Sequence, residues 1–174
     1  MGRSASAGIP GRSRGAAVSR AADLDFRIAG PDDATRVLAM MRDFYAEDRI
    51  VFEPARVQAG VGTLLAEPAH GEILLWLDAD GSVLGYGVLS ACFSLEWGGA
   101  FGLLDELYLR PCARGRGLGR RALDTLVRRA AARGWGTLRL EGNHHNAAAK
   151  RMYLAAGFID DERDLLTLSI GVAA

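Results

Sequence analysis

Two carboxylates lie side by side within an apolar stretch of the chain. Asp105 and Glu106 interrupt the run from Leu103 to Leu109, which otherwise has the composition of a β-strand. A carboxylate in such a place can accept a proton from a nucleophile, directly or through water. Side chains alternate along a strand, so we expect the two acids on opposite faces of the sheet, with one of them lining a site.

The residues that follow have the character of an anion-binding loop. Arg114 to Gly119 read RGRGLG, and apolar periodicity predicts a helix from Leu118 that ends at Gly134. Backbone N–H groups of a glycine-rich loop, together with the positive end of a helix dipole, favour a phosphate at this position.

Spacing excludes two of the common phosphate loops. A Walker loop needs a glycine followed by lysine, and no glycine of this chain is followed by lysine. The dinucleotide fingerprint G-x-G-x-x-G begins at Gly115 but meets Arg120 where its third glycine belongs. The pattern that remains is Arg114-x-x-Gly117-x-Gly119.

A second pattern lies between Asn143 and Phe158, which read NHHNAAAKRMYLAAGF. Asn146 has the residue type of a helix N-cap, and Gly157 suits the position just after a helix. Asn146 and Tyr153 are seven residues apart, so they share one face of the predicted helix.

These two patterns, in this order, resemble the signatures of the GNAT family of acyl-CoA-dependent N-acetyltransferases. The resemblance is specific over residues 103–158 and implies acetyl-CoA (coenzyme A) as cofactor. In the family the loop amides hold the pyrophosphate, a strand backbone pairs with the pantetheine arm, and an asparagine approaches that arm from the far side. By resemblance, the coenzyme-binding residues are Leu107, Leu109, Arg114, Gly115, Arg116, Gly117, Leu118, Gly119 and Asn146.

The resemblance also implies roles in proton transfer. Tyr153 matches the general acid that protonates the leaving thiolate. The polyamine acetyltransferases of the family favour Asp105 as the base, whereas other members favour the adjacent position, so Glu106 stays a candidate. A backbone N–H near Leu107, freed by a β-bulge, would stabilise the developing oxyanion.

The acceptor site is expected where the family places it, in the first two helices and the loop before the central strand. That region carries Tyr45, Glu47, Asp48, Glu53, Glu96 and Trp97, of which Tyr45, Glu47, Glu96 and Trp97 are the predicted substrate-binding residues. Acids interleaved with aromatic residues suit a small cationic primary amine. A protein or peptide acceptor, or an acyl-CoA-binding regulatory module without catalysis, remain the alternatives.

The predicted elements form a single α/β domain with a mixed sheet. A long helix joins the central strand to the next one, which predicts a parallel pair with a right-handed crossover. In the family this pair splays apart to admit the pantetheine arm. The domain is expected over residues 23–174, after an N-terminal tail of residues 1–22. Strands are predicted at Asp25–Ala29, Glu72–Leu77, Val83–Phe93, Leu103–Leu109, Thr137–Glu141 and Leu165–Ile170, and helices from Pro31, Pro54, Leu118 and Asn146.

Composition narrows the class of protein. The 174 residues have a formal net charge of zero, but residues 1–22 hold four arginines and no acid, so the remainder is acidic. An acidic body argues against nucleic acid as partner, and no apolar run approaches the ~18 residues of a membrane span. Two cysteines and three histidines, His144 and His145 among them, offer neither a disulfide framework nor metal-ligand spacing. We expect a cytoplasmic protein without a metal, and the family resemblance adds a homodimer as an expectation.

Overall fold

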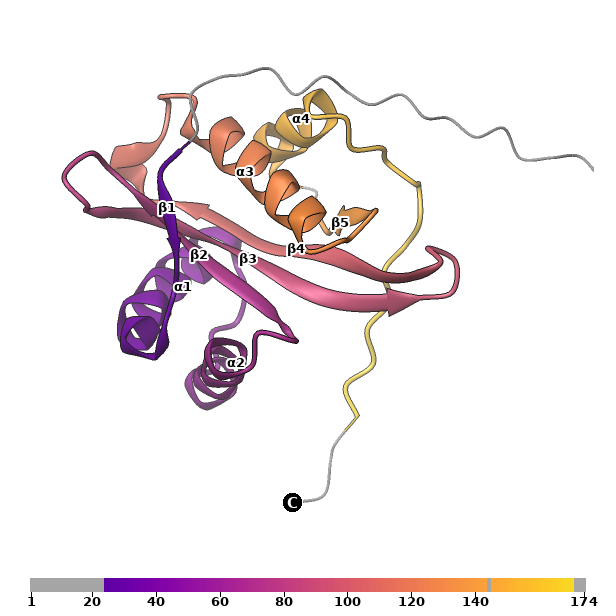
Figure 1. The fold of residues 1–174 in the computed structure, drawn as a ribbon, viewed down its shortest axis with the longest axis horizontal. Helices are drawn as coiled ribbons and strands as arrows, with labels where there is room; N and C mark the ends of the chain where they lie inside the picture. Colours follow the sequence, from indigo (N-terminus) through magenta and orange to yellow (C-terminus); the bar gives the residue numbers. More distant parts are fainter. Residues whose placement is uncertain (1–23, 144, 171–174) are drawn as a thin grey trace, which may run out of the picture.

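The computed structural model describes residues 24–143 and 145–170, and the expectations for residues 1–22 and His144 lie outside this range. Five strands form one sheet in the order β1-β2-β3-β4-β5 (Figure 1). The first three pairs are antiparallel and β4–β5 is parallel, as predicted. The strands are β1 (Phe26–Ile28), β2 (Gly71–Leu77), β3 (Val83–Ser94), β4 (Gly99–Leu109) and β5 (Leu138–Leu140).

Helices cover both faces of this sheet. One face carries α1 and α2, and the other carries α3 and α4; we call these the α1 face and the α3 face (Figure 1). Short 3-10 turns, η1 and η2, precede α1 and α3. Among the described residues, no helix combines the length and apolar composition needed to cross a bilayer. The bounds are η1 (Pro31–Asp33), α1 (Ala34–Asp48), α2 (Pro54–Ala66), η2 (Pro111–Ala113), α3 (Leu118–Ala132) and α4 (Ala147–Ala155).

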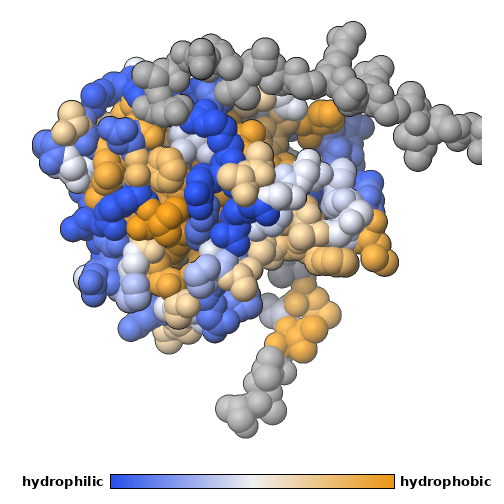
Figure 2. Space-filling view, in the orientation of Figure 1, coloured by the Kyte–Doolittle hydropathy of each residue, from blue (hydrophilic) through white to orange (hydrophobic). Residues whose placement is uncertain are grey.

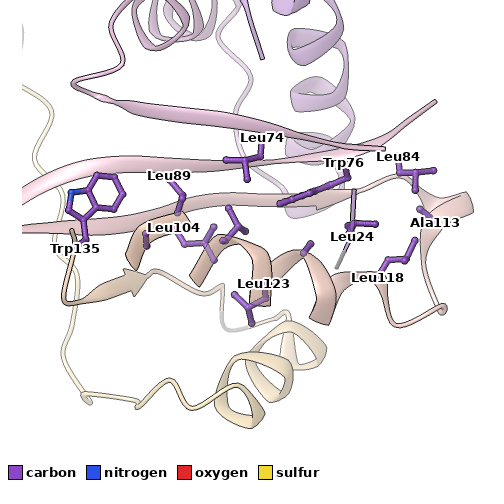
Figure 3. Packing of buried hydrophobic residues seen from close by; sticks show 13 residues of the cluster. Leu24, Leu74, Trp76, Leu84, Leu89, Leu104, Ala113, Leu118, Leu123 and Trp135 are labelled. Atoms are coloured by element: carbon purple, nitrogen blue, oxygen red, sulfur yellow. The ribbon is translucent and has the colours of Figure 1, made fainter. Parts of the chain in front are cut away.

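The α3 face holds an aliphatic core (Figure 3). The apolar residues of α3 follow the helical period: Leu126 reaches Gly87 of β3, Leu123 lies on the side of α4 (Figure 3), and both are fully buried. They meet Trp76 and Leu74 of β2 and Leu89 of β3 in one cluster. This packing fixes α3, and hence the loop before it, against the sheet.

The α1 face is packed more with aromatic and sulfur-containing side chains. Met40 of α1 and Tyr86 of β3 are fully buried there, next to Tyr108 of β4. The rings of Tyr86 and Tyr108 lie 5.8 Å apart, and Phe44 of α1 approaches Tyr108 at the same distance. The C-terminal half of α1 is therefore held over the first part of β3 and the C-terminal end of β4.

The central strand β4 is irregular on both of its edges. On the β3 side, Glu106 pairs with Val88 but Leu104 pairs with Leu89, which leaves Asp105 as the extra residue of a bulge. On the β5 side, pairing covers Gly102 to Leu104 and then stops. Residues 105–109 of β4 thus have no strand partner on the β5 side among the described residues, which is the splayed parallel pair that the family resemblance implies.

The strand predicted at Leu165–Ile170 is not formed, so that prediction is wrong. Residues 159–170 have no regular secondary structure and run away from the sheet. Strand composition alone does not make a strand, because each strand needs a neighbour for its backbone hydrogen bonds. Here Arg163 is held at the β3–β4 turn by Glu96, which directs the residues after it past the end of the sheet.

Candidate active site

Both acids of β4 lie on the α1 face, so the expectation of opposite faces is wrong. Leu104 packs in the core of the α3 face, whereas Glu106 contacts Tyr45 of α1. Regular alternation would place these two residues on the same face, and the bulge at Asp105 shifts the alternation by one. Burial raises the pKa of Glu106, hydrogen bonds from Tyr45 and Tyr86 partly oppose this rise, and the negative charge of the neighbouring Asp105 adds to it.

Glu106 is buried and shared between two tyrosines. Tyr45 donates its hydroxyl to Oε1 at 2.6 Å, and Tyr86 donates to Oε2 at 2.5 Å. Burial is the main cause that raises the pKa of both phenols, and their bonds to the Glu106 carboxylate add to it. Both hydroxyls therefore stay protonated at neutral pH, and both carboxylate oxygens of Glu106 are engaged. Sequence reasoning missed Tyr86, because within a buried strand it has the pattern of a packing residue.

Asp105 differs from Glu106 in its exposure and in its hydrogen-bond partners. It is exposed at the bulge and has no hydrogen-bond or ion-pair partner among the described residues. Partial removal from water raises the pKa of its carboxyl above the ordinary value of 3.8. An unpartnered carboxylate with a raised pKa is a better proton acceptor than an ordinary aspartate.

The loop between η2 and α3 has the backbone that an anion site needs. Gly115 and Gly117 both adopt φ of +73°, and a Cβ at either position would meet no atom within 4 Å. Gly117 is the N-cap of α3 and provides no side chain to cap it, so the first amides of the helix remain available. Leu118 and Arg116 line a cavity of about 210 Å³ on the β1–β2 side of the loop.

Arg114 joins this loop to α1. Its Nε donates to the carbonyl of Leu109 at 2.8 Å, and its Nη2 donates to Glu47 Oε2 at 2.7 Å. The guanidinium also lies over the ring of Tyr108. Glu47, predicted to bind substrate, is thus placed against the loop and not beside Tyr45's hydroxyl.

Helix α4 forms as predicted. The Asn146 side chain accepts a hydrogen bond from the amide of Ala149 at 3.1 Å and so caps the helix. Tyr153 packs partly against the α3-face core, with its ring edge-on to Phe158. Burial first, and the charge of Asp48 second, raise the pKa of the Tyr153 phenol.

Asp48, the last residue of α1, reaches the elements of the opposite face. It accepts a hydrogen bond from Asn143, and His145 Nε2 lies 3.4 Å from Oδ1. Its negative charge also raises the pKa of the Tyr153 phenol. The end of α1 therefore contacts residues that precede α4, although the two helices cover different faces of the sheet.

The remaining predicted substrate residues lie at the far end of β4. Glu96, in the β3–β4 turn, forms a bidentate ion pair with Arg163 at 2.8 and 2.9 Å. Trp97 lies under the guanidinium of Arg139 on β5. The structure therefore divides the four predicted substrate residues among three places, and of these only Tyr45 is next to the acids.

A comparison with protein families decides the assignment. The model of the acetyltransferase (GNAT) family matches residues 37–158, which include both irregular edges of β4, the glycine loop and α4. The chain belongs to the GNAT family. The β4–β5 pairing that stops after Leu104 and the glycine-rich start of α3 both agree with membership of this family.

Two similar curated proteins also carry the names of acetyltransferases. A mycothiol acetyltransferase of Amycolatopsis mediterranei is 33% identical over 144 residues, which are 81% of this GNAT chain and 41% of the relative. An uncharacterized N-acetyltransferase of Bacillus subtilis is 29% identical over 92 residues, 53% of this chain and 62% of the relative. The chain thus spans less than two thirds of either curated relative.

The fold recurs in solved structures. An integron cassette protein from the mobile metagenome of Cole Harbour Salt Marsh is 30% identical, with a TM-score of 0.72. The likeness covers 85% of this chain and 91% of that protein. The same single-domain architecture is therefore shared almost end to end.

Proposed function

We propose that this GNAT-family chain is an N-acetyltransferase that transfers an acetyl group from acetyl-CoA to a small cationic primary amine. The observation that carries the proposal is the opening after Leu104 in the β4–β5 ladder. The unpaired stretch of β4 begins at Asp105, an unpartnered carboxylate, and leads towards the uncapped start of α3, while Tyr153 lies on α4 against the α3-face core.

The chain's own groups fit the coenzyme. The edge of β4 at Leu107 and Leu109 offers backbone groups to an amide-bearing arm, as a neighbouring strand would, although the Leu109 carbonyl already accepts a hydrogen bond from Arg114. The open glycines and first amides of α3 suit a pyrophosphate, since a Cβ at Gly115 or Gly117 would project into empty space. Bound there, acetyl-CoA would supply an acetyl group activated as a thioester.

Asp105 is our candidate for the general base. An alkylammonium has a pKa near 10.4, so about one molecule in a thousand is a free amine at neutral pH. The Asp105 carboxylate is unpartnered and exposed, so it can take the proton from the ammonium. Glu106 could accept that proton only by losing the hydrogen bond from Tyr45 or from Tyr86. We therefore assign it the role of holding these two tyrosines in place.

Tyr153 is our candidate for the general acid. Its raised pKa keeps the proton on the hydroxyl oxygen at neutral pH, where it can be donated to a leaving thiolate. Asp48, which also orders the Asn143–His145 loop, contributes to that raised pKa.

The acceptor class follows from what surrounds Asp105. Tyr45 presents its ring next to Phe44 and Phe52, at 5.8 and 5.7 Å between centroids. Aromatic faces beside a carboxylate attract an organic cation. A compact amine fits this arrangement, and the Glu96–Arg163 pair is then no part of the acceptor site.

The test is a thermal-shift titration with acetyl-CoA, coenzyme A, NAD and ATP, followed by thiol release with polyamines, aminosugars and basic peptides. We expect stabilisation by the first two and turnover with a small amine. Gly117→Asp should abolish coenzyme binding, while Gly134→Asp, at a second open glycine with φ of +80° beyond α3, should retain it. Turnover with peptides alone would overturn the acceptor class, and stabilisation by NAD or ATP alone would overturn the site.

A further inference from the structure

The later part of β3 leaves side chains of the α1 face only partly covered. Val88 packs in the α1-face core, so alternation turns Ser90 and Cys92 towards the same side of the sheet. These two side chains are half-buried, whereas Val88 is buried. Burial raises the pKa of the Cys92 thiol, and the negative charge of Asp105 raises it further. Cys92 therefore lies within electrostatic range of the candidate base.

Strand β4 adds two apolar side chains to this part of the α1 face. A Cβ at Gly102 would meet Trp135, which belongs to the core of the α3 face. Its neighbours Phe101 and Leu103 therefore turn to the α1 side, where Phe101 is buried and Leu103 is half-buried. Phe101 pairs with Cys92 across the ladder. We call this uncharged set the β3–β4 strip: Ser90, Cys92, Phe101 and Leu103.

Most acids expected around the acceptor already have partners. Those that form a hydrogen bond or an ion pair with another side chain are Glu47, Asp48, Glu96 and Glu106. Glu53 stands at the start of α2, one turn before Arg56, and the formal charges of these two residues cancel. Asp105 is thus the carboxylate beside the strip that has no partner among the described residues.

Two arginines stand on the aromatic side of the candidate site. Arg42 lies over the ring of Phe52, at 5.2 Å from its centroid. Burial and Glu106 raise the pKa of the Tyr45 phenol, and the positive charge of Arg56 lowers it. Cations in these places repel an ammonium group that approaches them. The site therefore attracts one ammonium at Asp105 and offers no second anionic position beside it among the described residues.

Residues 165–170 bring no charge to this side of the sheet. After Arg163 pairs with Glu96, the chain continues on the side that carries α1 and α2 (Figure 1). The run reads LLTLSI, and Figure 2 shows it mainly as hydrophobic surface. Leu166 and Leu168 are 90 and 83% exposed. The surroundings of the strip thus add apolar groups rather than acids.

We propose that the acceptor is an amine with one ammonium and an apolar body, and that the body lies along the β3–β4 strip while the ammonium meets Asp105. The inference rests on the function proposed above and narrows its acceptor class. A second ammonium on the same molecule would reach the strip, lose water there and find no carboxylate in return.

An apolar body has the opposite balance. Its methylene groups or ring bury apolar surface against the strip, which favours binding. Apolar surroundings also favour the neutral form of the reacting amine over the ammonium, and the neutral form is the nucleophile. The strip therefore selects the body of the acceptor, and Asp105 selects and deprotonates its single charge.

The first test compares two amines of equal length that differ in the second charge. Pentylamine carries one ammonium, and cadaverine carries two. In thiol-release assays with acetyl-CoA, we expect kcat/KM to be higher for pentylamine by about tenfold or more. Equal values, or a preference for cadaverine, would overturn the inference and leave the proposed function standing. Stabilisation by acetyl-CoA without turnover of any amine, spermidine and aminosugars included, would overturn the proposed function and the inference with it.

The second test places a carboxylate on the strip. Cys92→Asp adds it on the α1 side, and Ala91→Asp adds the same charge at the adjacent exposed position, which faces the other way. Cys92→Asp should raise the kcat/KM of cadaverine relative to pentylamine by about fivefold or more, because the second ammonium gains a partner. Ala91→Asp should leave this ratio unchanged.

The measured quantity is a ratio within one variant, so a general loss of stability or activity does not imitate the expected shift. Thermal shift with acetyl-CoA shows that each variant is folded. If Cys92→Asp does not fold, Ser90→Asp places the charge at a position of the strip that is already polar. A ratio that stays at the wild-type value in the folded strip variant, or that shifts equally in Ala91→Asp, would overturn the inference.

Discussion

The two faces of the sheet are packed with different kinds of side chain. On the α3 face, leucines and two tryptophans, Trp76 and Trp135, form an apolar core. On the α1 face, a buried carboxylate meets two tyrosine hydroxyls, and a second carboxylate stands exposed beside them. The side chains of the first cluster are apolar except for indole N–H groups, of which Trp76 Nε1 is buried without a hydrogen-bond partner. On the second face the buried carboxylate of Glu106 is paired, whereas Asp105, our candidate base, is left without a partner among the described residues.

Strand β4 contributes side chains to both faces, and the bulge at Asp105 changes the face to which successive side chains point. Leu104 belongs to the aliphatic core and Glu106 to the polar cluster, although they are two residues apart. We therefore propose that the α3 face supplies most of the stability and that the candidate base lies on the α1 face, whereas the candidate acid, Tyr153, lies on α4 and packs against the α3-face core. Four measurements test this division.

The largest effect is expected from Asp105→Asn. If Asp105 accepts the proton of the ammonium, kcat/KM for the amine should fall by about 10²–10⁴-fold. The free energy of unfolding should hardly change, because this side chain has no partner among the described residues. Urea unfolding with circular dichroism is the control. A variant that loses stability and keeps its activity would place Asp105 with the structural residues.

The converse change is Leu123→Ala on the α3 face. Leu123 is fully buried, so its truncation should lower the free energy of unfolding by about 2–5 kcal/mol. The variant that remains folded at low temperature should keep the wild-type kcat/KM. A large loss of kcat/KM in folded protein would mean that the α3 face also positions reacting groups.

Glu106→Gln tests the shared carboxylate. The amide nitrogen of glutamine donates and cannot accept, so Tyr45 or Tyr86 loses its acceptor in the interior. We expect the free energy of unfolding to fall by about 1–3 kcal/mol, together with a smaller loss of activity than in Asp105→Asn. If Glu106→Gln proves the more severe of the two for kcat/KM at unchanged stability, the roles of the two acids are reversed.

The smallest effect concerns the pH profile. Burial raises the pKa of Asp105, so its base form is lost as pH falls through a value above the ordinary 3.8. The acid limb of kcat/KM should accordingly lie at higher pH than for a solvated aspartate, and activity should rise as pH rises through it. The limb should disappear in the residual activity of Asp105→Asn. A limb that persists in that variant would belong to another group.

The sequence by itself determined the elements whose signals are local. The apolar period of α3, the Asn146 cap and the glycines at Gly115 and Gly117 depend on residues a few positions apart, and each lies where it was predicted. The parallel pairing of β4 and β5 could also be predicted, because a long helix joins the two strands in the sequence. The family, too, could be inferred from residues 103–158, because both of its motifs are contiguous.

The tertiary structure alone decided which groups meet. A bulge depends on the partner strand, so nothing within residues 103–109 could show that Asp105 shifts the alternation and brings both acids to one face. Tyr86 can bond to Glu106 because β3 lies beside β4. Glu47 pairs with Arg114 of the glycine loop and is thereby held away from the Glu106 cluster. The run at residues 165–170 has strand composition, yet it forms no strand within its own chain, because a strand is defined by its neighbour.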